Sequence, residues 1–429
     1  MKIVLIGGGS YVFAPSVIND LIMKAKFTNF DFVLVDINLE GAQLMAKIAE
    51  RVAQGEGVSI KVSATSDRLQ ALEGADFVIT SIAYQGAKRW NTDYEICKQE
   101  GIPHDLRETG ALSGIIYSFR QITLLMNICR DMEKLCPNAI LLNVSNPLTR
   151  IHEAINRYTN IKAYGFCNVA QCGEHGYERV AETLGRHYED IEVLSAGINH
   201  FSWILSVKDR ATKADLLPEY IEKIHADTRP RADIQVFQRW YKQYGAIAAP
   251  PVDHAADFLP YQPNVHYLDT PPYHGNAEER MKRVENMKQV ANGTLDYRGA
   301  ECFNHGSWEH PALVAVAIHT KADMYLPILN VPNDNCIPQL PQDAIVEVPV
   351  NIAVGKIVPA TGIVLPQAVA DLCNNQCEVA EMVARAAVQG DRALAFKIIE
   401  VDQAITEKAA AARALTRMLA AHEDIFTMK

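Results

Sequence analysis

The chain opens on a short apolar run that leads directly into three glycines, MKIVLIGGGSYVFAP. The segment KIVLI has the length of a buried strand, and the segment that follows the glycines is helix-like. A strand, a glycine turn and a helix form the first unit of a doubly wound α/β fold. The turn is unusual because valine replaces the third glycine of the common pattern. Its members are Gly7, Gly8, Gly9 and Ser10, with Val12 at the substituted position.

Strand-like and helix-like segments alternate through the first 190 residues. Apolar runs with little polar alternation recur as DFVLVD, VSIKVSAT, DFVITSI, AILLNVS and IKAYGF, separated by segments with helical patterning. Such runs indicate a parallel sheet that is buried on both faces. Ligands bind such sheets at the carboxyl ends of the strands. We therefore predict an N-terminal Rossmann-like, doubly wound parallel sheet over residues 1–190.

The pattern changes in the second half of the chain. EVLSAGINHFSWILSVKD, AIVEVPVNIA and KIVPA are strand-like, residues 215–300 contain helical pieces broken by a proline-rich segment, and residues 368–422 are helical. We predict a C-terminal α+β domain over residues 191–429 that binds substrate and metal and ends in helices. Two domains are also the simplest division of a chain of 429 residues.

Composition excludes several classes of partner. The net charge of -10 leaves no basic excess to neutralise phosphates, so we expect no nucleic-acid partner. No apolar run is long enough to span a membrane, and the first one is too short for a signal peptide. The nine cysteines follow no disulfide spacing. A reduced, cytoplasmic setting is the expectation.

The glycine turn and the second strand together indicate a dinucleotide site. Glycines let backbone amides approach a pyrophosphate, and Asp36 closes the second strand, where a carboxylate accepts from a ribose hydroxyl. A 2′-phosphate would be repelled by that carboxylate. We therefore predict that the chain binds NAD rather than NADP.

Two further segments carry candidate metal ligands. Cys167, in GFCNV, follows the sixth strand, and His200, in AGINH, lies in an apolar segment. Alone, each is as well explained as a buried core residue. Together, a thiolate and an imidazole are good ligands for a divalent metal with open positions, although the spacing does not show that they meet.

Other polar residues stand at strand ends and in loops. Each is individually explained as well by a turn or a solvated surface. Those able to contact a ligand or transfer a proton are Asn146 in NVSNPL, Glu108 in RETGALSG, and Asp253, His254 and Asp257 in PPVDHAADF.

The segments GGGS, LVDI, ETGALSG, CPNAILLNVSNP, GFCNV, AGINH and DAIVEVP occur in one order. In this the chain resembles glycoside hydrolase family 4, the NAD- and divalent-metal-dependent glycosidases. The resemblance implies a homodimer or homotetramer that acts on a small glycoside. It also implies a mechanism distinct from the two-carboxylate scheme of most glycosidases.

By this resemblance, NAD takes a hydride from C3 of the sugar, a base removes the C2 proton, and the aglycone leaves by elimination. Water then adds and the hydride returns, so the net reaction is hydrolysis. The metal, manganese by resemblance, is held by Cys167 and His200. Asn146, Asn168 and Glu108 map to the substrate-contacting part of the family motifs. Asp253 is the expected base, with His254 as the alternative.

The resemblance also bears on the sugar. Phospho-sugar members carry an arginine just after the fourth strand, where this chain has SIAYQG, with Ala83 and Tyr84. We therefore expect an unphosphorylated hexoside or uronide, with Tyr84 and Arg89 as candidates to face C6. The alternatives are a 6-phospho-β-glucosidase of the same family, favoured by CNVA, and a malate- or lactate-type dehydrogenase, which shares the Rossmann half.

Overall fold

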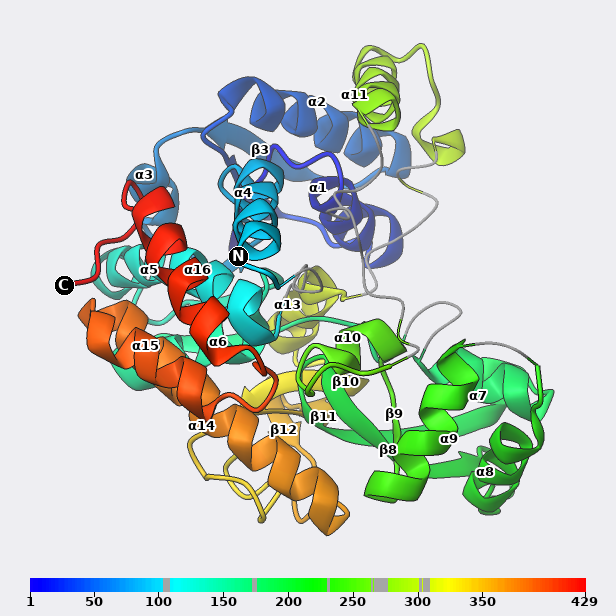
Figure 1. Ribbon diagram of the computed structural model, residues 1–429. Helices are drawn as coiled ribbons and strands as arrows, with labels where there is room; N and C mark the ends of the chain where they lie inside the picture. The colour runs from blue at the N-terminus through cyan, green and yellow to red at the C-terminus, as the bar shows by residue number, and fades with distance from the viewer. Residues whose placement is uncertain are drawn as a thin grey trace.

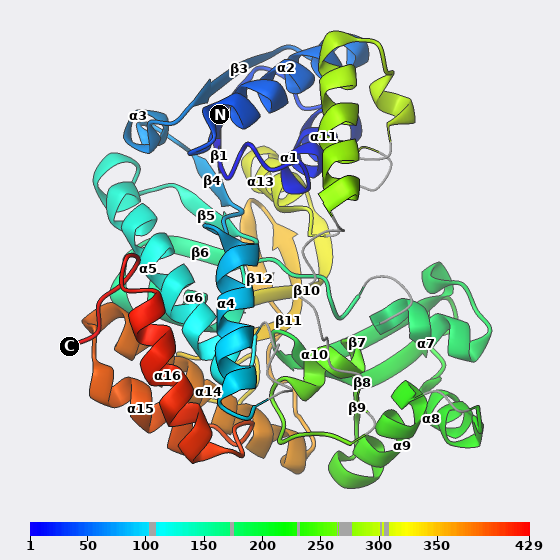
Figure 2. The same cartoon turned by 45° about the horizontal axis from the view of Figure 1, so that its top comes forward.

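The protein is described by a computed structural model that covers residues 1–102, 109–171, 176–229, 232–263, 265, 277–300, 303 and 309–429. Within these residues, twelve strands form one sheet (Figures 1 and 2). Eleven of them run in the order β3-β2-β1-β4-β5-β6-β10-β11-β7-β8-β9, and β12 pairs with β11. The predicted fold class is confirmed, and both halves of the chain contribute to the same sheet.

The first six strands are parallel, as predicted, and β1 lies in their middle. Ile3 and Leu5 of β1 face one hydrophobic core, and Val4 and Ile6 face the other. This two-sided burial explains why the central strands β1, β4 and β5 are almost entirely apolar, whereas β3, at the edge of the sheet, alternates polar and apolar residues. The bounds of the first six strands are β1 Lys2–Ile6, β2 Phe30–Val35, β3 Ile60–Thr65, β4 Phe77–Thr80, β5 Ile140–Asn143 and β6 Lys162–Gly165.

Helices cover both faces of this parallel part. The first core takes side chains from α1, η1 and α2, and the second from α3, α4, α5 and α6. The π-helix η1 continues α1 without a break in the chain. The bounds are α1 Phe13–Ile18, η1 Asn19–Lys24, α2 Leu39–Glu56, α3 Arg68–Leu72, α4 Gly86–Gln99, α5 Ala111–Leu135 and α6 Leu148–Tyr158.

The second half adds antiparallel strands to the same sheet. The predicted β-structure near residue 200 is the hairpin of β7 and β8, and the two predicted late strands are β11 and β12. Strand β10 was not predicted, because Pro327 interrupts its apolar pattern where the pairing register with β11 shifts. The bounds are β7 Ile191–Ile198, β8 Phe201–Asp209, β9 Ile247–Ala248, β10 Met324–Pro332, β11 Ile345–Ala353 and β12 Lys356–Pro359.

The remaining helices include the predicted helical C-terminus. In both views α14, α15 and α16 lie beside α4, α5 and α6 (Figures 1 and 2). The ring of Phe426 packs edge-on against Phe119 of α5, with centroids 5.9 Å apart. The bounds are α7 Gly176–Leu184, η2 Tyr188–Asp190, α8 Leu217–Ala226, α9 Ala232–Tyr244, α10 Val252–Ala256, α11 Ala277–Asn292, η3 Tyr297–Gly299, α13 Pro311–Thr320, α14 Gln367–Gln389, α15 Arg392–Val401 and α16 Lys408–Ala421.

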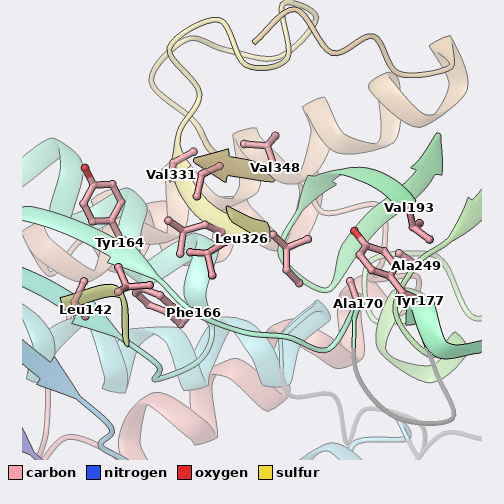
Figure 3. Close-up of a cluster of buried hydrophobic side chains, with 14 of the residues drawn as sticks. Leu142, Tyr164, Phe166, Ala170, Tyr177, Val193, Ala249, Leu326, Val331 and Val348 are labelled. Carbon is pink, nitrogen blue, oxygen red and sulfur yellow. The ribbon is translucent and has the colours of Figure 1, made fainter. Parts of the chain in front are cut away.

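Apolar side chains also fill the junction between the halves. Figure 3 shows Leu326, Val331 and Val348, from β10 and β11, near Tyr164 and Phe166 at β6. The division into two domains at residue 190 therefore stays a prediction, since sheet and core both continue across it. Among the described residues, every helix is too short or too polar to cross a bilayer.

Candidate active site

The glycine turn after β1 has no room for side chains. Gly7 has φ +95°, and a Cβ there would lie 2.0 Å from the backbone oxygen of Ser81. A Cβ on Gly8 would lie 2.8 Å from the Cβ of Leu34. Both glycine N–H groups donate to the oxygen of Val35 at 2.9 Å, which fixes the turn between β1 and β2. This close backbone approach is what a dinucleotide cradle requires.

Asp36 lies against the same turn. Its Oδ2 accepts from the Gly9 N–H at 2.9 Å, and its Oδ1 accepts from the Asn38 N–H at 2.8 Å. The Ser10 hydroxyl accepts from the Phe13 N–H at 3.1 Å, at the start of α1. The structure thus brings the predicted glycines, the serine and Asp36 into one cluster at the carboxyl edge of the sheet. A small glycine-lined turn beside a carboxylate fits the adenosine side of NAD.

Cys167 and His200 meet, which the spacing alone did not show. Cys167 lies two residues beyond the end of β6, and His200 lies in the turn between β7 and β8 with φ +63°. The Cys167 Sγ is 3.2 Å from the His200 Nε2. His200 is 2% exposed, so the pair lies at the base of the site rather than on the surface.

Hydrogen bonds orient the His200 ring. Its Nδ1 is 3.3 Å from the Thr109 hydroxyl, which itself donates to Asp257 Oδ2 at 3.3 Å. A hydroxyl that donates to a carboxylate accepts from the ring, so Nδ1 carries the proton and Nε2 presents its lone pair toward Cys167. Burial lowers the pKa of His200 well below its usual value, which keeps the ring neutral.

The surroundings of the Cys167 thiol favour its neutral form. Burial raises its pKa well above the usual value, and hydrogen bonds from Asn199 and the Val169 backbone offset this only in part. A neutral imidazole facing a buried thiol fits a divalent metal, which stabilises the thiolate. Among the described residues, no group of three or more His, Cys, Asp or Glu side chains is arranged to hold a metal ion, so the pair has no third protein ligand there. The protein's two ligands would leave positions open for substrate oxygens.

Asp253 and His254 form a couple beside this pair. The Asp253 Oδ1 accepts from the His254 backbone N–H at 3.0 Å and lies 3.0 Å from the His254 Nδ1. The centroid of the His254 ring is 5.1 Å from that of His200. Both side chains of the couple are about one-third exposed, at 30% and 32%. A carboxylate and an imidazole with this access are suited to proton transfer.

Two of the three residues predicted to contact substrate, Asn146 and Asn168, lie among the described residues. Strands β5 and β6 pair Asn143 with Gly165, so Asn146 and Asn168 leave the sheet at the same edge as Cys167. The Asn146 Oδ1 is buried and has no hydrogen-bond partner among the described residues. Asn168 is 9% exposed and directly follows Cys167. Glu108 lies outside the described residues.

Sequence reasoning missed the polar residues behind the metal pair. Glu347 is fully buried in β11 and accepts from the Ser202 hydroxyl and the Asn199 amide, each at 2.8 Å. Thr109, which orients His200, was also missed. The one available signal was a charged residue inside the apolar run AIVEVPV, which a strand buried on both faces does not tolerate without a reason.

Comparison with known proteins identifies the family of the chain. The model for "Family 4 glycosyl hydrolase" matches residues 2–184, and the model for "Family 4 glycosyl hydrolase C-terminal domain" matches residues 195–405. An alpha-galactosidase of Bacillus subtilis is 29% identical over 94% of this chain and 92% of its own, and an alpha-galacturonidase of that organism is 27% identical over 95% of each.

A solved structure shares the fold along the whole chain. It is a 6-phospho-alpha-glucosidase from gut microorganisms, in complex with NAD and Mn²⁺, with a TM-score of 0.80 and 21% identity. The superposition covers 100% of this chain and 99% of the other. Since the two family models together span nearly the entire sequence, the chain belongs to the family 4 glycosyl hydrolases.

Proposed function

We propose that this protein is an NAD- and divalent-metal-dependent glycosidase that acts on an unphosphorylated hexoside or uronide by redox elimination. The observation that carries the proposal is the Cys167–His200 pair, at the same sheet edge as the glycine turn. The relative solved with NAD and Mn²⁺ supports the choice of both groups. When bound, NAD supplies a reversible hydride acceptor at C3 and the cation, with Mn²⁺ as the expected metal, supplies a Lewis acid.

The chain's own residues hold these groups and the sugar in place. Cys167 and His200 hold the cation, while the turn around Gly8 and the Asp36 carboxylate hold NAD. Asn146 lies at the strand edge with a buried amide oxygen that a sugar hydroxyl can satisfy. Binding of this kind would hold C2 and C3 of the sugar in a fixed orientation toward the base and NAD.

The Asp253–His254 couple is the proposed base. Asp253 takes the C2 proton, and His254, 3.0 Å from its Oδ1, holds the carboxylate in position. Asp253→Asn is expected to lower kcat by about 10²–10⁴-fold, the range that general-base catalysis supplies. The measurement is the release of C2 deuterium into water during turnover, alongside kcat. NAD and Mn²⁺ affinities are expected to stay within about twofold of wild type.

His254→Asn provides the matched comparison for this assignment. With Asp253 as the base, His254→Asn lowers kcat less than Asp253→Asn does and still permits C2 deuterium exchange. If His254→Asn stops the exchange and Asp253→Asn does not, the histidine is the base and the assignment is reversed.

The proposal of an unphosphorylated sugar rests on the surroundings of Arg89, the arginine that follows β4. Arg89, in the first turn of α4, is buried. It donates to Asp424 Oδ1 at 3.0 Å and lies 3.2 Å from His422 Nδ1. Its guanidinium is therefore held by the C-terminal segment, away from a role at C6. The Tyr84 ring lies beneath it, 5.3 Å from the guanidinium carbon, and is 40% exposed. Tyr84 remains the candidate to face C6.

Hydrolysis of a nitrophenyl glycoside panel tests the function. The enzyme is supplied with NAD, Mn²⁺ and a thiol reductant, with and without a chelator, and the panel includes hexosides, uronides and 6-phosphoglucosides. We expect chelator-sensitive hydrolysis of a hexoside or uronide without net NADH. Hydrolysis at the same rate with and without the chelator contradicts the proposed role of the metal. A preference for 6-phosphoglucosides contradicts the proposal of an unphosphorylated substrate. Net NADH formed from a hydroxy acid would instead indicate a dehydrogenase.

A further inference from the structure

Glu347 is a carboxylate buried at the point where the two halves of the sheet join. It is 0% exposed. Its Oε1 accepts from the Ser202 hydroxyl at 2.8 Å, and its Oε2 accepts from Asn199 Nδ2 at 2.8 Å and Asn330 Nδ2 at 3.4 Å. The three donors come from the β7–β8 turn, from β8 and from β10, so one side chain ties three segments together.

These segments are the ones that carry the two proposed metal ligands. Glu347 is paired in register with Gly197 of β7 on one side and with Asn330 of β10 on the other. The Asn330 amide also donates to the Gly165 oxygen at 3.4 Å, two residues before Cys167. On the opposite side, Asn199 directly precedes His200. Glu347 thus lies between the strand that leads to the thiol and the turn that presents the imidazole.

Asn199 links the carboxylate to the thiol directly. Its Nδ2 carries two protons, one of which is directed to Glu347. The Asn199 side chain also acts on the Cys167 thiol, because it lowers the pKa of that thiol against the larger effect of burial. A change in the Glu347 head group therefore reorients an amide that contacts one ligand and is bonded through the backbone to the other.

The charge on Glu347 has no protein counter-ion among the described residues. No Lys, Arg or His forms an ion pair with it there, and its three partners are neutral. Burial raises its pKa to about 7. A buried charge is normally paired or coordinated to a metal. A divalent cation held by one thiolate keeps one net positive charge, which an ionised Glu347 neutralises.

We infer that Glu347 is a positioning residue for the metal ligands, one that sets the affinity of the site for its divalent cation through Asn199 and through charge. The inference rests on the proposed function, because it presupposes that Cys167 and His200 bind a metal. Glu347 itself is not placed among the ligands.

The test is the affinity for Mn²⁺ alone, measured on the full chain by electron paramagnetic resonance of free Mn²⁺ and by titration calorimetry. Glu347→Gln removes the negative charge. It also replaces one carboxylate oxygen, which accepts hydrogen bonds, with an NH₂ group that faces other donors. Mn²⁺ binding is expected to weaken by about 10–100-fold, the range found when groups behind metal ligands are removed. In Co²⁺-loaded protein, the thiolate-to-metal absorption band is expected to shift or weaken, because Cys167 is displaced.

Two further variants keep the test decisive. Ser195 lies in β7, and its hydroxyl is 2.6 Å from the hydroxyl of buried Tyr177 in α7, away from the metal pair. Ser195→Ala is expected to lower stability while leaving Mn²⁺ affinity within about twofold of wild type. Ser202→Ala removes one of the three donors to Glu347 and is expected to weaken Mn²⁺ binding by about threefold to fivefold. It decides the question if Glu347→Gln does not fold.

The outcomes separate this inference from the proposed function. Wild-type protein that binds no Mn²⁺ contradicts the proposed function. Wild-type protein that binds Mn²⁺ while folded Glu347→Gln binds it equally well overturns the positioning role alone. Equal weakening in Ser195→Ala also overturns it, since the effect would then reflect general loss of packing.

Discussion

Replacing Cys167 with serine is expected to remove Mn²⁺ binding and to lower kcat/KM for glycoside hydrolysis by at least about 10³-fold. Serine has nearly the same shape, but its hydroxyl does not ionise to a soft ligand as the thiol does. A Lewis acid supplies several kcal/mol to the stabilisation of charge, and about 4 kcal/mol corresponds to three powers of ten in rate. Metal content after dialysis and hydrolysis at saturating NAD are the two measurements.

A buried cysteine elsewhere provides the matched control for this replacement. Cys129 of α5 is 0% exposed and lies in the second core. Cys129→Ser makes the same chemical change and is expected to lower stability, since it buries a hydroxyl, while Mn²⁺ content stays that of wild type. His200→Asn is expected to match Cys167→Ser. If Cys167→Ser keeps both its metal and its activity, the metal site has been assigned to the wrong residues.

Replacing Gly7 with alanine is expected to cause a large loss of stability for the addition of a single methyl group. The new Cβ would lie 2.0 Å from the Ser81 oxygen, a backbone atom that cannot move without disturbing β4. The residue would also keep a φ of +95°. Strain and overpacking together are expected to lower the free energy of unfolding by at least about 3 kcal/mol. NAD is expected to bind at least about 100-fold more weakly, since the turn must shift.

Gly57 isolates the two causes of this loss. It ends α2 with φ +68°, and a Cβ there meets nothing within 4 Å. Gly57→Ala therefore carries the cost of a left-handed conformation alone, about 1 kcal/mol, and is expected to bind NAD like wild type. Urea unfolding and calorimetric titration with NAD measure both quantities. Equal losses at the two positions would show that the contact with Ser81 is relieved without cost.

The sequence predicted those features that depend on neighbours along the chain. The parallel strands were predictable because a strand buried on both faces is a nearly continuous apolar run, as in the last four residues of KIVLI. The contact between the glycine turn and Asp36 was predictable from the pairing expected of the first two strands. The turn directly follows the first strand and Asp36 directly follows the second, so both lie at the same edge of the sheet. The closeness of Asp253 to His254 follows from their adjacency in the chain.

Features that depend on distant partners were not predictable in this way. Arg89 was one of two candidates to face C6 of the sugar, and its pairing with Asp424, which lies 335 residues along the chain, could not be predicted. No role was predicted for Glu347, because its donors Asn199, in the β7–β8 turn, and Asn330, on β10, belong to segments whose order in the sheet differs from their order in the sequence. The meeting of Cys167 with His200 depended on the same strand order, and for this pair only the family resemblance anticipated it.

The continuous sheet also constrains how this molecule can move. β6 is paired to β10 at Gly165 and Asn330, and β11 is paired to β7 at Glu347 and Gly197. A hinge between the two halves would have to break these pairings, so rigid-body opening about the junction is disfavoured. Under the proposed function, we expect the distance between the dinucleotide cradle and the Cys167–His200 pair to change little during turnover. Entry of the sugar and exit of the aglycone are then expected to depend on loops at the sheet edge rather than on domain closure.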